Sequence, residues 1–301
     1  TDNNNNFNNL TISNGEVVSI FDLNAIRIIG SDTNNDLSIQ ANDDISLVGD
    51  ITTNTNTALE SADVTFTGNV RLDTSTDGGT VTIDTTASNG VVTFAGDIHN
   101  IDGNSPRNNL AIDTANGNVD IQGDIGSIYY IRSLEINKDI TSTAIVNINN
   151  IDTRINVFDS TNSIDITAGQ INLSGNLTTN HSTDDHARGI RLNSDVVLGN
   201  DVIITTSGNN SDGNVIITGD VTTDGTVYDL IVSSDTGDVS IGNIGTSTNA
   251  LSSLTINSGA TETSGTVSVG SIVTQGGSAG GINLTGQEIT LNGNIASNNN
   301  G

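Results

Sequence analysis

The chain of 301 residues has no cysteine, no methionine and no tryptophan, and it contains a single proline. Without cysteine it cannot be cross-linked by disulfide bonds, a composition that suits an exported protein at no risk of wrong pairing. Aromatic residues make up 3% and hydrophobic residues 33%, less than in a typical globular domain. No window shows helical spacing of apolar residues, and neither a signal peptide nor a membrane span is visible.

Positive charge is also scarce, because the chain has Lys138 and seven arginines against 35 acidic residues, for a net charge of −27. The basic residues are scattered and form no patch. Nucleic acid is therefore excluded as a partner, and neither anionic lipid binding nor insertion into a membrane is expected. The low apolar content combined with this charge would favour disorder, unless the apolar residues follow a regular pattern.

They do follow one, and the segment Val119–Ile125 shows it most clearly. Apolar and polar residues alternate, as in a strand with one buried face, and Gly123-Asp124 then makes a turn. Neighbouring variants lie roughly 19 to 28 residues apart, about a dozen in all. A second motif precedes most copies. It consists of leucine, usually a polar residue, and isoleucine or valine; examples are Leu10–Ile12, Leu110–Ile112 and Leu254–Ile256.

The repeat predicts an all-β fold, a right-handed parallel β-solenoid of about a dozen coils. Each coil holds at least two short strands, and residues 1–301 form one elongated domain that we expect to be a segment of a longer chain. Val119, Ile121 and Ile125 should be buried, with threonine, serine and asparagine between them exposed. The alternatives are a stack of antiparallel sandwich modules and a disordered chain.

The glycines in these motifs are predicted to lie at equivalent corners of the coils, and several of these glycines are expected to have positive φ. The asparagine or aspartate after each glycine is expected to stack on its equivalent and to bond backbone N–H groups or a cation, because bare carboxylates would repel. The predicted corner residues are Gly49, Gly68, Gly96, Gly123, Gly175, Gly219 and Gly293.

Two imidazoles and two carboxylates within six residues make one candidate metal cluster, formed by His181, Asp184, Asp185 and His186. A solvated loop is the competing interpretation. The many carboxylates favour a solvated outer surface, and calcium bound through oxygen ligands is the alternative. Of the other conspicuous side chains, His99 is expected in a surface turn, and Tyr129-Tyr130 and Tyr228 either pack under loops or form an aromatic patch for sugars.

No catalytic constellation or cofactor motif is found. Carboxylates are too plentiful to single out an acid–base pair, and the basic residues are too few, so we predict no enzyme. A carbohydrate-active β-helix enzyme of the polysaccharide lyase or hydrolase type is the alternative; a cleft with converging acids would favour it. Threonine pairs such as Thr65 and Thr67 suggest an ice-binding face, but such pairs do not recur at one place in every repeat, which argues against that function.

The alternation of Leu254–Ile256 with Val267–Ile272, and of Ile282–Leu284 with Ile289–Gly293, resembles the β-strand repeats of very large secreted bacterial surface proteins. It is similar in style to filamentous-haemagglutinin-type exoproteins and giant repetitive adhesins. The resemblance implies an extracellular, cell-surface β-helix shaft that serves as fibre, adhesin or coat, with cell-surface carbohydrate as one candidate partner. The Asn-Pro-Asn-Gly secretion signature of two-partner-secreted exoproteins is missing, since the one proline is Pro106.

Self-association is the last expectation. The end coils of a solenoid expose unpaired strand edges, and neither terminal sequence offers a capping helix. The chain is therefore expected either to continue into further coils or to pair with copies of itself in a fibre or lattice.

Overall fold

The computed structural model describes residues 9–54, 61–74, 76–102, 107–138, 140–155, 162–181, 189–207, 213–234, 236–258, 265–275 and 281–297. The chain divides into two compact units, Thr1–Asn149 and Asn150–Gly301, and each is described by itself. That the whole chain is one elongated domain stays a prediction.

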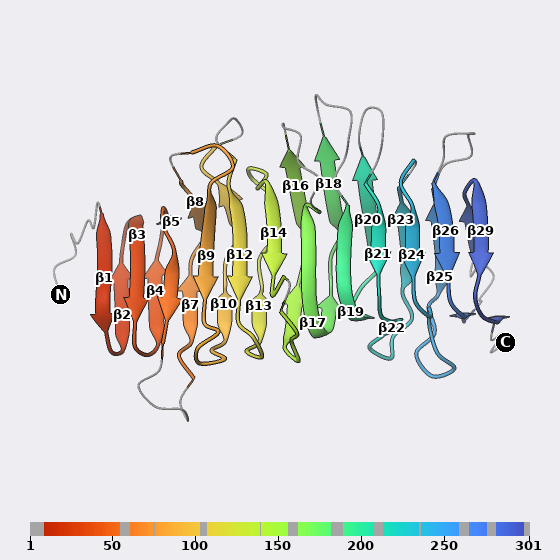
Figure 1. Ribbon diagram of the computed structural model, residues 1–301, viewed down its shortest axis with the longest axis horizontal. Coiled ribbons are helices and arrows are strands. Elements are labelled where there is room, and N and C mark those ends of the chain that lie inside the picture. The colour runs from red at the N-terminus through yellow and green to blue at the C-terminus, as the bar shows by residue number, and fades with distance from the viewer. Residues whose placement is uncertain are drawn as a thin grey trace. The chain divides into compact units, whose positions relative to one another are not determined.

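The first unit contains the strands β1 to β15, most of them three to six residues long (Figure 1). Their bounds are β1 Leu10–Gly15, β2 Val18–Asp22, β3 Ile26–Thr33, β4 Leu37–Ala41, β5 Ile45–Leu47, β6 Ile51–Thr53, β7 Val64–Thr67, β8 Val70–Leu72, β9 Thr80–Asp84, β10 Val92–Phe94, β11 Ile98–Asn100, β12 Asn109–Asp113, β13 Val119–Ile121, β14 Ser133–Ile136 and β15 Ile145–Ile148.

These strands stack in three parallel columns. The first column is β2-β4-β7-β10-β13-β15. The second runs β3-β5-β8-β11, and the third β3-β6-β9-β12-β14, because the first half of the long strand β3 pairs with β5 and its second half with β6. β1 pairs mainly with the second half of β3. Successive strands of the chain, such as β7, β8 and β9, belong to different columns, so a coil has three strands.

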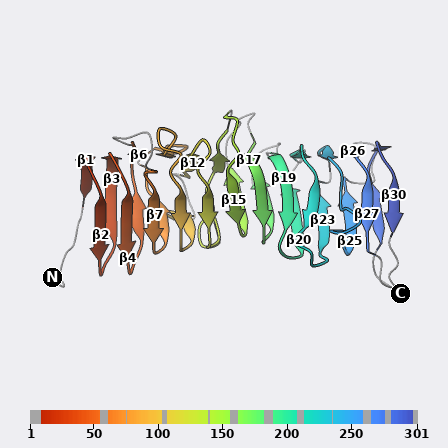
Figure 2. The same ribbon diagram turned by 90° about the horizontal axis from the view of Figure 1, so that it is seen from below.

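The second unit contains β16 to β30 and repeats this plan (Figure 2). Its strands are β16 Ile151–Ile155, β17 Ile164–Leu173, β18 Leu177–His181, β19 Ile190–Leu198, β20 Val202–Ser207, β21 Val215–Ile217, β22 Val221–Thr223, β23 Asp229–Ser233, β24 Val239–Ile241, β25 Ser253–Asn257, β26 Thr266–Val269, β27 Ile272–Thr274, β28 Ile282–Thr285, β29 Glu288–Leu291 and β30 Ile295–Ser297. Two of its columns are β16-β18-β20-β23-β25-β28 and β17-β19-β21-β24-β26-β29.

The parallel pairings confirm the predicted all-β solenoid and contradict the antiparallel sandwich alternative. Alternation explains why these residues form strands: in β12, Leu110 and Ile112 point inward and are fully buried, while the residues between them are partly exposed. Val119, Ile121 and Ile125 are buried as predicted. One aliphatic side chain therefore stacks on the next from coil to coil, and 33% apolar residues are enough for this narrow core.

Corner carbonyl groups are satisfied by buried hydroxyl groups. Thr85 Oγ1 donates to the carbonyl oxygen of Gly90 at 2.7 Å, and Thr114 Oγ1 donates to that of Gly117 at 2.6 Å. Because an unpaired buried carbonyl costs free energy, each threonine stabilises the bend at which its strand ends.

Candidate functional site

A cluster of charged side chains lies on the outer face of the second column of the first unit. Parallel register places Arg27 of β3 opposite Ser46 of β5, Ser46 opposite Arg71 of β8, and Arg71 opposite His99 of β11. Four residues spread over more than 70 positions of sequence thus form one straight row. Strand spacing in a parallel sheet sets adjacent members about 4.8 Å apart.

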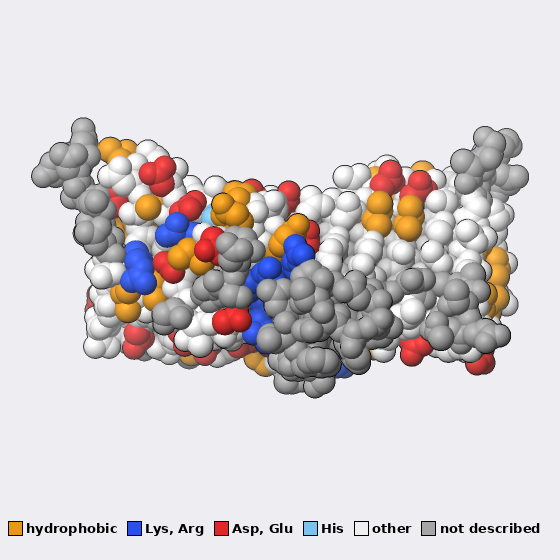
Figure 3. Space-filling view, turned by 90° about the horizontal axis from the view of Figure 1, so that it is seen from above, with side chains coloured by type: hydrophobic (Ala, Val, Ile, Leu, Met, Phe, Trp, Pro, Cys, Tyr) orange, Lys and Arg blue, Asp and Glu red, His pale blue; other side chains and the backbone are white. Residues whose placement is uncertain are grey.

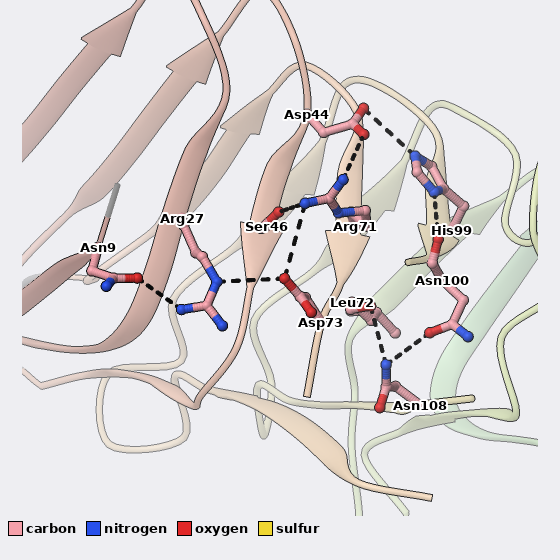
Figure 4. A network of polar contacts seen from close by, with 10 residues as sticks. All are labelled: Asn9, Arg27, Asp44, Ser46, Arg71, Leu72, Asp73, His99, Asn100 and Asn108. Atoms are coloured by element: carbon pink, nitrogen blue, oxygen red, sulfur yellow. Dashed lines mark hydrogen bonds and ion pairs between the residues drawn. The ribbon is translucent and has the colours of Figure 1, made fainter. Parts of the chain in front are cut away.

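Two aspartates beside the row connect its members (Figure 4). Asp44, just before β5, lies 3.7 Å from Arg71 Nη1 through Oδ2 and 3.6 Å from His99 Nε2 through Oδ1. Asp73, just after β8, brings Oδ2 within 3.4 Å of Arg27 Nε and 3.9 Å of Arg71 Nη2. Positive and negative groups alternate, so the cluster has a formal charge near zero although the chain carries −27.

His99 is almost completely buried, with a side chain 4% exposed. Its Nδ1 lies 2.8 Å from the carbonyl oxygen of Asn100. A carbonyl can only accept, so Nδ1 carries the proton and Nε2 faces Asp44. Asn108 fixes the Asn100 side chain from behind, donating from Nδ2 to Asn100 Oδ1 at 2.7 Å and to the Leu72 carbonyl at 3.1 Å. The expectation of a surface turn for His99 is wrong, because it lies buried in β11.

An aromatic surface adjoins the histidine. The Tyr129 ring lies 6.1 Å from the His99 ring in an edge contact, and the Tyr129 carbonyl accepts a hydrogen bond from the Asn100 N–H at 3.1 Å. Tyr129 is 39% exposed and Ile128 is 53% exposed. In Figure 3 the pale blue histidine has hydrophobic side chains on one side and charged ones on the other. Apolar and polar groups therefore meet at one place on this face.

The polar groups of the cluster keep unused hydrogen-bonding capacity. Within the part of the chain that the structure describes, His99 Nε2 and Arg71 Nε are buried and have no hydrogen-bond partner. The contacts of Asp44 with Arg71 and His99 exceed hydrogen-bond length, whereas Arg71 Nη2 donates to Ser46 Oγ at 2.6 Å. The cluster is thus held in place at its base and open to a further polar group at Asp44.

The predicted corner glycines all lie at bends between strands. Gly68 has a positive φ of 127°, and it is the one described member of the set in that conformation. The expectation that several would share it is wrong; most of these glycines are required by close approach. A Cβ on Gly49 would lie 1.9 Å from the Ile29 carbonyl oxygen, and one on Gly123 would lie 2.4 Å from the Gly96 carbonyl carbon.

Side chains after the corner glycines form ladders between coils. In the first unit, the Asp97 N–H donates to Asn69 Oδ1 at 3.1 Å and the Asp124 N–H donates to Asp97 Oδ1 at 2.9 Å. Each carboxylate or amide oxygen therefore accepts from the backbone of the next coil, as expected for stacked acidic residues. The second unit repeats the pattern, with N–H groups of Asp220, Asn243 and Ser271 donating to the side-chain oxygens of Asp195, Asp220 and Asn243.

The predicted metal cluster falls mainly outside the described residues, which include His181, at the end of β18, but not Asp184, Asp185 or His186. Among the residues that are described, no group of three or more histidine, cysteine or acidic side chains could hold a metal ion. No helix in the described ranges is long and apolar enough to cross a membrane.

Two other aspartates have perturbed acidity. Burial raises the pKa of Asp152 in β16 from 3.8 to about 6, opposed by the charge of Arg154. Burial raises the pKa of Asp113 in β12, and the neighbouring carboxylates Asp84 and Glu135 raise it further. Asp113 stands directly opposite Asp84 in the register of β12 and β9, so the stacking of coils itself creates this like-charge pair.

No protein-family model, curated protein or solved structure matches this chain.

Of the cluster, sequence reasoning considered His99 and Tyr129 but did not connect them with Arg27, Asp44, Arg71 or Asp73. A signal was present, since Arg27, Arg71 and His99 each follow the first apolar residue of a strand. Aligning the repeats by register would have put Arg27, Arg71 and His99 in one row.

Proposed function

We propose that this chain is a structural, non-enzymatic protein of an extracellular surface, the shaft of a fibre, surface layer or adhesin. The observation that carries the proposal is the repetition of one bonded unit. Inward aliphatic pairs, corner glycines and side-chain ladders to the next coil recur in both units. Such a construction gives lengthwise stiffness to any number of coils, because each coil is bonded to its neighbours in the same way.

The parallel β-solenoid is compatible with the repeat regions of large secreted bacterial surface proteins. On that basis we propose the finer assignment, to proteins built like filamentous-haemagglutinin-type exoproteins or giant repetitive adhesins. Localisation at the cell surface, and cell-surface carbohydrate as a partner, are part of the same proposal. The proposal includes neither nucleic-acid binding nor insertion into a membrane.

Self-association is supported by the strand edge at β29 and β30. Ile289, Leu291 and Ile295 are between 43% and 50% exposed, although their register partners in β26 and β27 are buried. A further coil stacked in the same register would cover these side chains and pair the free strand edges. We propose that a further coil of the same kind covers this edge, either from a longer chain or from a second copy of this chain in a fibre.

Calcium is proposed as a stabilising ion and not as a catalytic cofactor.

Two proposals compete for the charged cluster at Arg71: a binding surface on a shaft, and the active site of a carbohydrate-active β-helix enzyme. The cluster favours binding because both arginines already face carboxylates and the ring of His99 is buried.

Light scattering and negative-stain microscopy over a range of protein and calcium concentrations test the structural role. We expect filaments whose number falls in Leu291→Asp, which places a charge on the exposed core edge, but not in Thr290→Asp, on the outer face of the same strand. Release of reducing ends from a panel of polysaccharides is measured in parallel. Persistent monomers that cleave a polysaccharide would overturn the proposal in favour of the enzyme.

A further inference from the structure

The surface around Asp44 has the properties of a binding site for an uncharged polyhydroxyl compound. Asp44 offers two oxygens that accept hydrogen bonds, and Arg71 offers donors 3.7 Å away. Polar atoms at such a separation are readily bridged by a hydroxyl group, which donates to one and accepts from the other. The buried His99 Nε2, without a hydrogen-bond partner among the described residues, faces the same carboxylate from 3.6 Å.

Charge selects among ligands at this position. An anion would meet the carboxylate of Asp44, with Asp73 close by, and a cation would meet the guanidinium of Arg71. The net charge of −27 opposes the approach of acidic polymers in general. A neutral ligand with several hydroxyl groups avoids both repulsions and can use the donor and the acceptor together.

The aromatic neighbour narrows the ligand to a sugar ring. Tyr129 exposes part of its ring beside His99, and Ile128 adds exposed apolar surface. A pyranose has an apolar face of C–H groups that packs on an aromatic ring, and an edge of hydroxyl groups for the polar side chains. Because Ser46 holds Arg71 and Asn100 holds His99, little side-chain entropy would be lost on binding.

We propose that Asp44, Arg71 and Tyr129 bind a neutral sugar residue of a surface polysaccharide. The inference rests on the proposed surface function, for which it names the ligand class and the site. It requires no bond to be made or broken.

Isothermal titration of the full chain with neutral oligosaccharides of glucose, galactose, mannose and N-acetylglucosamine tests the proposal, with oligogalacturonate as the acidic comparison. We expect millimolar or tighter binding of at least one neutral sugar and weaker binding of oligogalacturonate. Asp44→Asn and Tyr129→Ala should each weaken binding about tenfold or more, since each removes a main contact. Asp43→Asn, on the exposed neighbour, and Tyr228→Ala, in the second unit, should bind like the wild type.

Thermal unfolding of each variant verifies that it folds. If Tyr129→Ala does not fold, Asp44→Asn still tests the proposal. No binding of any neutral sugar by the wild type, or unchanged binding in Asp44→Asn, would overturn the inference. The assay uses soluble chain and soluble sugar, so it does not depend on fibres. Filaments without sugar binding would contradict this site alone, and sugar binding without filaments would contradict only the self-association.

Discussion

Gly49 lies where two coils approach each other closely, with an added Cβ placed 1.9 Å from the Ile29 carbonyl oxygen. Gly49→Ala must push the backbone of one coil away from the other, so we expect a loss of about 1–3 kcal/mol in the free energy of unfolding. Gly30→Ala is the matched control, because its Cβ would meet the nearest atom, the Asp50 carbonyl oxygen, at 3.6 Å. Urea unfolding measures both; equal stabilities of the two variants would show that close approach is not the constraint.

Asp152 makes stability depend on pH. Burial raises its pKa to about 6, against 3.8 in the unfolded chain, so between these values the folded protein binds more protons. Stability contributed by the neutral form is therefore full below pH 3.8 and falls as the pH rises to about 6. Because the side chain is only partly buried, we expect an effect of about 1 kcal/mol after discounting for solvent screening.

Asp152→Asn removes this titration. The variant should gain stability relative to the wild type between about pH 4 and pH 7, measured by urea unfolding at both values. Asp43→Asn removes one negative charge at an exposed position and controls for the change in net charge. If the difference in the free energy of unfolding between Asp152→Asn and the wild type stays constant with pH, the raised pKa assigned to Asp152 is contradicted.

Among the structural elements, the ladder at the corner between the first and second columns connects coils independently of the strands. Asp97 accepts from the Asp124 N–H through Oδ1 at 2.9 Å. Asp97→Ala leaves that N–H without its acceptor and should cost about 1–2 kcal/mol, whereas Asp97→Asn keeps an oxygen in place and should cost much less. Amide hydrogen exchange at Asp124 reports the bond directly. Equal protection in the two variants would assign the stability to the strands alone.

Strand order and burial at this scale follow from the sequence to a large extent. Alternating residues such as Val119 and Ile121 mark the buried face, and the glycine after each copy marks the bend. These signals are local and repeat many times, so the parallel solenoid was predictable. The number of strands per coil was not, because β8 and β11 are only three residues long and their pattern is too short to recognise.

The candidate site was mostly hidden for a different reason. Arg71 and His99 are neighbours only because His99 follows Arg71 by 28 positions, the length of one turn, and that length varies from coil to coil. A shift of one residue in the register would have sent either side chain to the interior. Sequence reasoning assigned His99 to a surface turn because it did not foresee β11, in which the carbonyl oxygen of Asn100 accepts a hydrogen bond from Nδ1 of the buried imidazole.

For the whole molecule, the dominant physical property is a net charge of −27 on 301 residues. Eight lysine and arginine side chains neutralise little of it, and two of these, Arg27 and Arg71, already face aspartates of the cluster. Stacking coils brings further carboxylates together, as at Asp84 and Asp113. Self-repulsion should therefore destabilise the folded chain at low ionic strength.

Added salt should raise the thermal unfolding midpoint, because the screening length falls from about 30 Å at 0.01 M to about 10 Å at 0.1 M. Calcium chloride and sodium chloride are compared at matched ionic strength, with chelator in a third series. A larger rise with calcium, reversed by the chelator, would indicate specific binding by carboxylates; equal rises would indicate screening alone. A midpoint that does not change with sodium chloride would show that the carboxylates are already compensated within the fold, for which the ladder bonds to backbone N–H groups provide the physical means.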